Sequence, residues 1–262
     1  MTLKSFGGPL KAVQKKKFGV RVRCIVCDGT STNISTLELL GVRIPDSPFF
    51  TSVFNEKVYT VLHAAHMIKL ARNCFAGDNL INISWRYIEN LFKVQQEEGL
   101  HLANKLSKAH VEEWSKRKMK VKLATQVLSR SVAHALEFLK NMGHRDFENC
   151  DSTVQFILLI YEIFDRVNAH SPFVSGCKQA ITRKNIDEVD AFFCSSETSL
   201  GQLKNLQGIK IINSRLRTLI ITCLRVTISL SNDLFEEHSS DKLWYFIPYR
   251  LSQDSIERFF RE

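Results

Sequence analysis

Residues 21–33 read RVRCIVCDGTSTN, an alternating apolar stretch that runs into a turn and decides how the fold begins. The apolar and β-branched residues over 18–27 predict a strand, and the small polar residues after it predict a turn and a helix starting between Ser31 and Ser35. Asp28, at the end of this strand, is the first acidic residue of the chain. Its position suits two roles, a turn residue that caps local backbone groups or a metal ligand.

Outward from this segment, strands alternate with helices and then give way to helices alone. The first helix ends near Gly41, KVYTVLHA (residues 57–64) predicts a second strand, and apolar spacing over 66–74 predicts another helix. From Trp85 onward every pattern is helical. The predicted elements there are one long helix over 121–139 that ends near Gly143, a helix over 151–168, loop with short helices over 170–208, a helix over 216–231 and a last helix from Asp254.

Composition and charge narrow the class of protein. The chain has 262 residues, 44% of them hydrophobic, which is enough for one large or two ordinary domains with a buried core. Its formal charge of +9, with basic runs at 15–17 and 116–122, favours a polyanionic partner such as nucleic acid over a merely solvated surface. No membrane span or secretory signal is predicted, and the odd number of cysteines, seven, indicates reduced thiols.

Six strings carry a family resemblance when taken in their order along the chain. From Val20 onward the sequence resembles P-element-type transposases, including the vertebrate THAP-domain transposase homologues. The strings are CDGTSTN (27–33), HMIKLARN (66–73), EGLHLANKL (98–106), MKVKLATQVLSRSVAHALEFL (119–139), FDRVN (164–168) and YRLSQDSIERFF (249–260).

The resemblance implies an α/β plus α fold, a partial RNase H-like core interrupted by a mainly helical GTP-binding insertion. This agrees with the independent pattern of strands first and helices afterwards. The expected division is a basic N-terminal segment over 1–17, a partial RNase H-like core over 18–76, the helical GTP-binding insertion over 77–245, and a return to the core with a truncated catalytic helix over 246–262.

The resemblance also implies a catalytic centre in which three carboxylates hold two divalent metal ions, here Mg²⁺, for phosphoryl transfer. Asp28 would be the second carboxylate and Glu257 the third, both catalytic and metal-ligating. The first should lie upstream, but residues 1–27 contain no Asp or Glu. We therefore expect this chain to be catalytically incomplete by itself. From spacing alone, Asp254 and Glu257 also fit a capping box at a helix start.

For GTP, the sequence has no G-x-x-x-x-G-K-[ST] loop, so the nucleotide expectation rests on the resemblance alone. By motif, the nucleotide-binding residues are Lys105, Lys120, Val121, Ser129, Asp165, Asn168 and Asp254. Lys120 and Ser129 would lie on the one long helix, and Asp165 and Asn168 on one face of the next. Because Asp254 lies one turn before Glu257, bound GTP could order the helix that carries a catalytic carboxylate.

Three functions follow from the sequence and the resemblance. The first is a fragment of a GTP-dependent cut-and-paste DNA transposase, the second a transposon-derived GTP- and DNA-binding protein without catalysis, and the third a decayed copy without activity. The expected partners are DNA (transposon ends) and GTP, with a possible homo-oligomer, no membrane and a nuclear location. A less favoured alternative is a zinc site in which a C-x-x-C and an H-x-x-H pair combine, with Cys24, Cys27, His63 and His66 as ligands.

Overall fold

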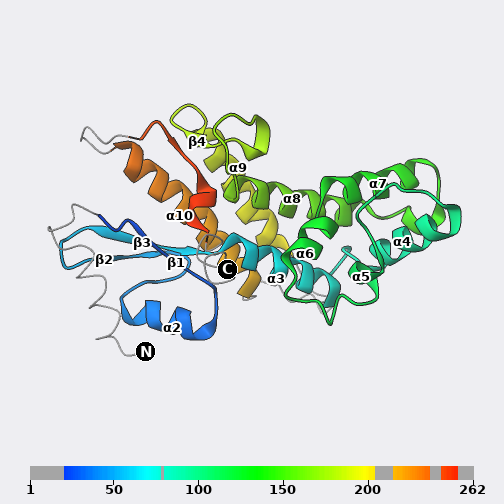
Figure 1. Ribbon diagram of the computed structural model, residues 1–262, viewed down its shortest axis with the longest axis horizontal. Coiled ribbons are helices and arrows are strands. Elements are labelled where there is room, and N and C mark those ends of the chain that lie inside the picture. Colours follow the sequence, from blue (N-terminus) through cyan, green and yellow to red (C-terminus); the bar gives the residue numbers. More distant parts are fainter. Residues whose placement is uncertain (1–20, 78–79, 204–214, 237–242, 253–262) are drawn as a thin grey trace, which may run out of the picture. The chain divides into compact units, whose positions relative to one another are not determined.

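The computed structural model describes residues 21–77, 80–203, 215–236 and 243–252 (Figure 1). Its strands are β1 Cys24–Cys27, β2 Phe49–Thr51, β3 Lys57–Leu62, β4 Ile181–Thr182 and β5 Tyr245–Phe246. Its α-helices are α2 Ser31–Leu39, α3 Ala64–Gly77, α4 Arg86–Glu98, α5 Lys108–Val111, α6 Val121–Val127, α7 Arg130–Asn141, α8 Asp151–Val167, α9 Ile186–Gln202 and α10 Arg215–Glu236.

These elements form two compact units, and each is described by itself. The mixed α/β unit draws on Met1–Ala64, Val167–Phe193 and Thr218–Glu262. The helical unit draws on Ala65–Arg166 and Cys194–Arg217. The mixed α/β class with a helical insertion, expected from the sequence, is thereby confirmed.

The mixed unit is built around a three-stranded sheet in the order β1-β3-β2. β1 runs parallel to β3, with Cys24 opposite Tyr59, and β2 runs antiparallel to β3. β3 is central and its residues from Val58 to Leu62 are all buried. Figure 1 shows α2 on one side of this sheet and α10 on the other.

α10 packs on the sheet through specific contacts. The Cys223 thiol donates to the Leu62 carbonyl at 3.7 Å, and the Tyr59 hydroxyl donates to Asp233 Oδ2 at 2.6 Å. A Cβ on Gly29 would meet Leu219 Cδ1 at 2.7 Å, so this turn accepts only glycine without a shift of the leucine. These contacts fix the segment that follows β1, where Asp28 lies.

The helical unit is held by an aromatic core. Phe75 of α3 is 1% exposed, and its ring centroid lies 5.1 Å from that of Trp85 and 5.5 Å from that of Phe156 on α8. Aromatic rings at these separations add to the apolar area that they bury. Around them, α4, α7 and α8 bury apolar stripes at helical spacing.

The prediction of a single helix over 121–139 is wrong. The helix ends at Val127 and a new one starts at Arg130, because Leu128 (φ −85°, ψ 63°) and Ser129 (φ −129°, ψ 154°) leave the helical region. The Ser129 hydroxyl donates to the Gln126 carbonyl at 2.8 Å, which satisfies an end of α6. Leu128 stays buried, so the apolar stripe continues across the break and conceals it.

Two further predictions need correction. Residues 170–208 were expected to be loop with short helices, but α9 occupies 17 residues of this stretch. Its buried positions, Val189, Phe193, Ser196 and Leu200, follow helical spacing despite the many polar residues between them. The strand expected over 18–27 is a strand only over Cys24–Cys27 in the described part, and the short β2 was not expected at all.

Among the described helices, one reaches the length and apolarity of a membrane span, over Leu216–Glu236 of α10, and 67% of its most apolar window is buried inside the protein. Buried core helices of soluble proteins reach the same values, so this finding alone is weak support for a membrane.

Candidate nucleotide-binding site

Four of the residues expected to bind nucleotide lie along α5, α6 and α7 of the helical unit. Lys105 is exposed in the turn before α5. Lys120 is the exposed N-cap residue of α6, Val121 is the first residue of that helix, and Ser129 is the N-cap residue of α7. The Val132 N–H donates to the Ser129 carbonyl at 3.1 Å, whereas the Arg130 and Ser131 amides make no backbone hydrogen bond to the described residues, and an anion is stabilised at such a helix start.

His110 joins α5 to α6 and is 2% exposed. The Ser107 N–H donates to His110 Nδ1 at 3.1 Å, so this ring nitrogen is an acceptor. Nε2 therefore carries the proton and donates to Gln126 Oε1 at 3.0 Å. Burial lowers the pKa of His110 most strongly, and the charge of Arg72 lowers it further, against the opposing effect of the Gln126 and Ser107 bonds. The packing of α5 on α6 thus requires the neutral imidazole.

The need for a neutral His110 imidazole makes the stability of the helical unit depend on pH. Because the folded pKa lies below the unfolded value of about 6.5, the unfolded chain binds the proton more readily. The stabilisation is present above that pH and is lost as the pH falls through the folded pKa. We expect His110→Gln to flatten the decline of unfolding free energy below about pH 6.5, measured by urea denaturation across pH.

The exposed His101 supplies the matched control, because His101→Gln makes the same substitution outside α5 and α6. An unchanged acid profile in His110→Gln would contradict the assignment.

Arg72 of α3 fixes the segment that leads into Lys120. It is 0% exposed, and its Nη2 donates to the carbonyls of Arg117 and Lys118 at 3.1 Å and 3.2 Å. Its Nε donates to Asn73 Oδ1 at 2.9 Å. Burial lowers the pKa of this guanidinium, a cost that its carbonyl partners offset. The backbone just before α6 is therefore anchored to α3.

The start of α7 lies against α8. The Arg130 guanidinium carbon sits 5.4 Å from the Tyr161 ring centroid. Asp165 follows Tyr161 by four residues on α8, which places it one turn further along the same face. The structure thus brings Ser129 and the part of α8 that carries Asp165 into one region. Asn168, expected on the same helix face, follows the last residue of α8 and falls in the mixed unit. Asp254 lies outside the described residues.

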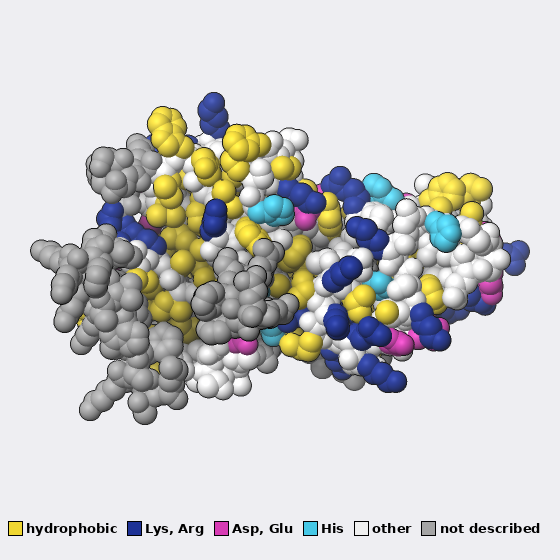
Figure 2. All heavy atoms as spheres, in the orientation of Figure 1, with side chains coloured by type: hydrophobic (Ala, Val, Ile, Leu, Met, Phe, Trp, Pro, Cys, Tyr) yellow, Lys and Arg dark blue, Asp and Glu magenta, His cyan; other side chains and the backbone are white. Residues whose placement is uncertain are grey.

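The surface around this region is basic. Lys116, Arg117, Lys118, Lys120 and Lys122 are all exposed, and Figure 2 shows Lys and Arg side chains gathered over the part that Figure 1 labels α5 and α6. Arg117 is paired with Glu113, whereas Lys105 and Lys120 make no ion pair with any described residue. Among the described residues, Lys120 at the start of α6 and Lys105 in the turn before α5 therefore have no ionic partner.

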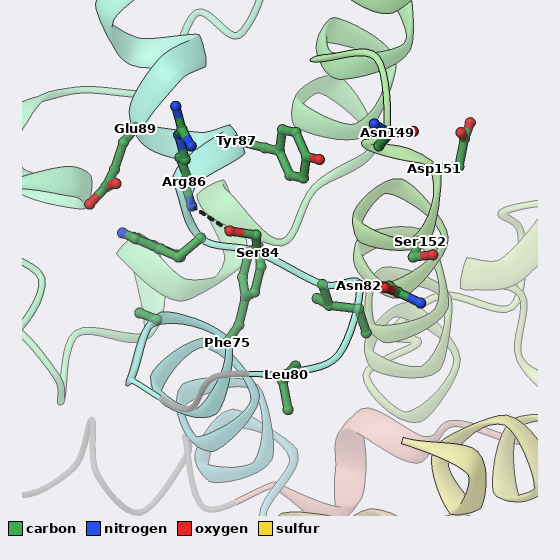
Figure 3. Close-up of a pocket in the computed structure, with 13 residues that line it drawn as sticks. Phe75, Leu80, Asn82, Ser84, Arg86, Tyr87, Glu89, Asn149, Asp151 and Ser152 are labelled. Atoms are coloured by element: carbon green, nitrogen blue, oxygen red, sulfur yellow. Dashed lines mark hydrogen bonds between the residues drawn. The ribbon is translucent and has the colours of Figure 1, made fainter. Parts of the chain in front are cut away.

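A separate cavity of about 760 Å³ lies in the same unit (Figure 3). Asn82, Tyr87, Asn149 and Ser152 are among its lining residues, and the Arg86 N–H donates to Ser84 Oγ at 3.3 Å beside it. None of the described residues expected to bind nucleotide lines this cavity. The predicted nucleotide region and the cavity are therefore different places.

Asp28 in the mixed unit has its carboxylate engaged in the local turn. Oδ1 accepts from Asn33 Nδ2 at 2.5 Å and from Thr30 Oγ1 at 2.9 Å, which fixes the start of α2. Burial, and then the Asp28 charge, raise the pKa of the Cys27 thiol to about 11. A protonated thiol is a poor zinc ligand. Glu257 lies outside the described residues, and within the described ones no group of three or more His, Cys, Asp or Glu side chains is placed to hold a metal.

Known protein families, curated proteins and solved structures show similarity to this chain. The family described as the TNP-like, GTP-binding insertion domain matches residues 65–180. The chain is 23% identical over 261 residues to the human DNA transposase THAP9, covering 93% of the chain, and 26% identical over 213 residues to the Drosophila melanogaster Transposable element P transposase, covering 78%. The solved Drosophila P element transposase strand transfer complex matches the whole chain with a TM-score of 0.84 at 24% identity.

The chain is thus similar to P-element-type transposases, and its residues 65–180 match the GTP-binding insertion domain family. It spans 28% and 27% of the two curated relatives and 58% of the matched chain in the solved structure. The insertion-domain match begins at residue 65, where the helical unit also begins.

Sequence reasoning missed two residues that organise the helical unit, Arg72 and His110. Both lie inside amphipathic patterns, where a basic side chain is normally exposed. The one available signal was the S-x-x-H spacing of Ser107 and His110, which resembles a capping box with histidine in place of Glu or Gln.

Proposed function

We propose that this chain is the GTP-binding portion of a P-element-type DNA transposase, and that its helical unit binds GTP with Mg²⁺ at the starts of α6 and α7. The match of residues 65–180 to the GTP-binding insertion domain carries the proposal. The unpaired lysines at this region supply the charge that a triphosphate requires.

The residues suit the two parts of a magnesium nucleotide. Lys105 and Lys120 would neutralise phosphate oxygens, and the amide groups at the start of α7 would donate to them. Asp165 would supply a hard anionic oxygen to the Mg²⁺ shell. Bound Mg²⁺ would supply positive charge against the phosphates, while Arg72 keeps the backbone before Lys120 in position.

For catalysis, the proposal assigns metal ligation to Asp28 and Glu257 in the assembled transposase, where two metal ions would activate the attacking oxygen and stabilise charge at phosphorus. This chain alone would bind GTP and contact DNA without cutting it, because two ligands do not complete the carboxylate set. A nuclear location follows from a role on chromosomal DNA and belongs to the same proposal.

The proposal is tested by titrating the full chain with a fluorescent GTP analogue in the presence of Mg²⁺. We expect saturable binding, and we expect Lys120→Ala to weaken it about tenfold, since a charge-assisted hydrogen bond contributes roughly 1.5–3 kcal/mol. Lys93→Ala is the matched control, because Lys93 is an exposed lysine on α4 that pairs with Glu97.

Asp165→Asn distinguishes the contribution of Mg²⁺ from that of the phosphate contacts, because it keeps the shape of the side chain and removes its negative charge. Its defect should appear in Mg²⁺ and be small in EDTA. Absence of saturable binding by a chain whose circular dichroism shows folded helix would end the nucleotide proposal. Equal losses of affinity in Lys120→Ala and Lys93→Ala would show that the nucleotide does not bind at Lys120.

A further inference from the structure

The mixed unit presents aromatic and basic side chains together around β4 and β5. Trp244 is 89% exposed, and Leu243 and Tyr245 beside it are also exposed. Arg183 and Lys184 are exposed directly after β4. Figure 2 shows hydrophobic side chains, with Lys and Arg among them, over the part that Figure 1 labels β4. Large exposed apolar groups of this kind mark interaction surfaces.

The short sheet fixes how these groups are arranged. β4 and β5 pair antiparallel with Thr182 opposite Tyr245. The pairing ends there, with Arg183 and Lys184 in the turn directly after β4 and Leu243 and Trp244 directly before β5. Because the strands are antiparallel, the two cations and the two apolar groups lie at the same end of this short sheet.

The loop that carries the two cations is rigid. Asn185 Oδ1 accepts from the Thr182 N–H at 2.7 Å and from its hydroxyl at 3.1 Å. Asn185 Nδ2 donates to the Ala180 carbonyl at 3.0 Å. These hydrogen bonds hold the backbone of the turn in one conformation. Binding through Arg183 and Lys184 therefore costs little backbone conformational entropy.

A cleft of about 700 Å³ is lined by Arg183, Lys184, Leu243 and Trp244, with Asn185 and Thr182. Its lining thus combines the apolar side chains of Leu243 and Trp244 with the cationic side chains of Arg183 and Lys184. A flat apolar group that is linked to an anion would satisfy both. An unpaired nucleotide has this chemistry, because its base stacks and its phosphate pairs with the cation.

We propose that this β4–β5 cleft binds single-stranded DNA, with a base stacked on Trp244 and neighbouring phosphates held by Arg183 and Lys184. Unpaired bases are required because the faces of paired bases are covered by their neighbours in the duplex. Asp187 and Glu188 lie in the first turn of α9, which begins at Ile186, and their negative charge would disfavour phosphates there. The inference deepens the DNA part of the proposed function and is independent of the nucleotide region.

The test is a titration of the full chain with short oligothymidylate, without GTP, following tryptophan fluorescence and anisotropy of the labelled strand. We expect quenching by stacking, and Trp244→Ala should weaken binding about tenfold because base–aromatic stacking contributes on that order. Trp244→Phe should keep most of the affinity and lose the quenching, since Trp85 is buried in the helical unit and Trp114 is half-buried there. Arg183→Glu should weaken binding and flatten its salt dependence.

Arg145→Glu is the matched control, being an exposed arginine of the helical unit. Equal affinity for duplex and single strands, unchanged affinity in Trp244→Ala, or quenching that persists in Trp244→Phe would each overturn the inference. So would concentration-dependent self-association that Trp244→Ala abolishes, because the cleft would then be a protein interface. GTP binding in the same samples is a separate readout, so loss of one proposal does not decide the other.

Discussion

Phe75→Ala is expected to lower the free energy of unfolding by about 4 kcal/mol, since truncating a buried phenylalanine removes its transfer energy and leaves a cavity. Phe75 is packed between Trp85 and Phe156, and both partner rings would lose a face. The measurement is urea denaturation followed by circular dichroism. The helical unit should lose stability, because all three rings belong to it.

Phe138→Ala is the control for this change. Phe138 lies on α7 of the same unit and is 47% exposed, so the same truncation should cost well under about 1 kcal/mol. Similar losses for the two variants would show that Phe75 is not at the centre of this core.

Arg72→Met is expected to lower the unfolding free energy by about 2 kcal/mol, because hydrogen bonds from a charged donor contribute roughly that much. Methionine keeps much of the volume and removes the donors to the carbonyls of Arg117 and Lys118. The same change should weaken binding of the GTP analogue, since it releases the backbone before Lys120. Stability is measured in urea and binding at a temperature where the variant is fully folded.

Arg72→Lys separates charge from geometry, because one ammonium cannot reproduce a planar set of three bonds. It should recover part of the stability and little of the binding. Arg145→Met, at an exposed arginine, should change neither. Full binding by a folded Arg72→Met protein would contradict the positioning role of Arg72.

The order of elements could be predicted because it depends on local patterns. The strand before Asp28, the helix after it, the buried β3 and the long α8 all follow from apolar periodicity and turn residues. β2 was missed because three residues are too few to show an alternation. α9 was missed because Cys194, Ser195 and Ser196 favour helix weakly, and tertiary burial decides the outcome.

The candidate site was less predictable, for a physical reason. The break between α6 and α7 depends on the hydrogen bond of one serine hydroxyl, and the apolar stripe runs across it unchanged. Arg72 can be buried because carbonyls distant in sequence accept hydrogen bonds from it, which no local pattern records. The nucleotide-binding roles of the residues named by resemblance stay predictions. The structure shows which of these residues lie in the helical unit.

The turn at Asp28 affects how relatives can be interpreted. Asn33 and Thr30 donate hydrogen bonds to one oxygen of this carboxylate. The Asp28 side chain therefore stabilises the local fold independently of any contact with DNA. Selection for a stable protein would preserve such an aspartate long after loss of cleavage. An intact aspartate here in a transposon-derived host protein is therefore poor proof of an active enzyme, and the informative positions are acidic residues that cap nothing.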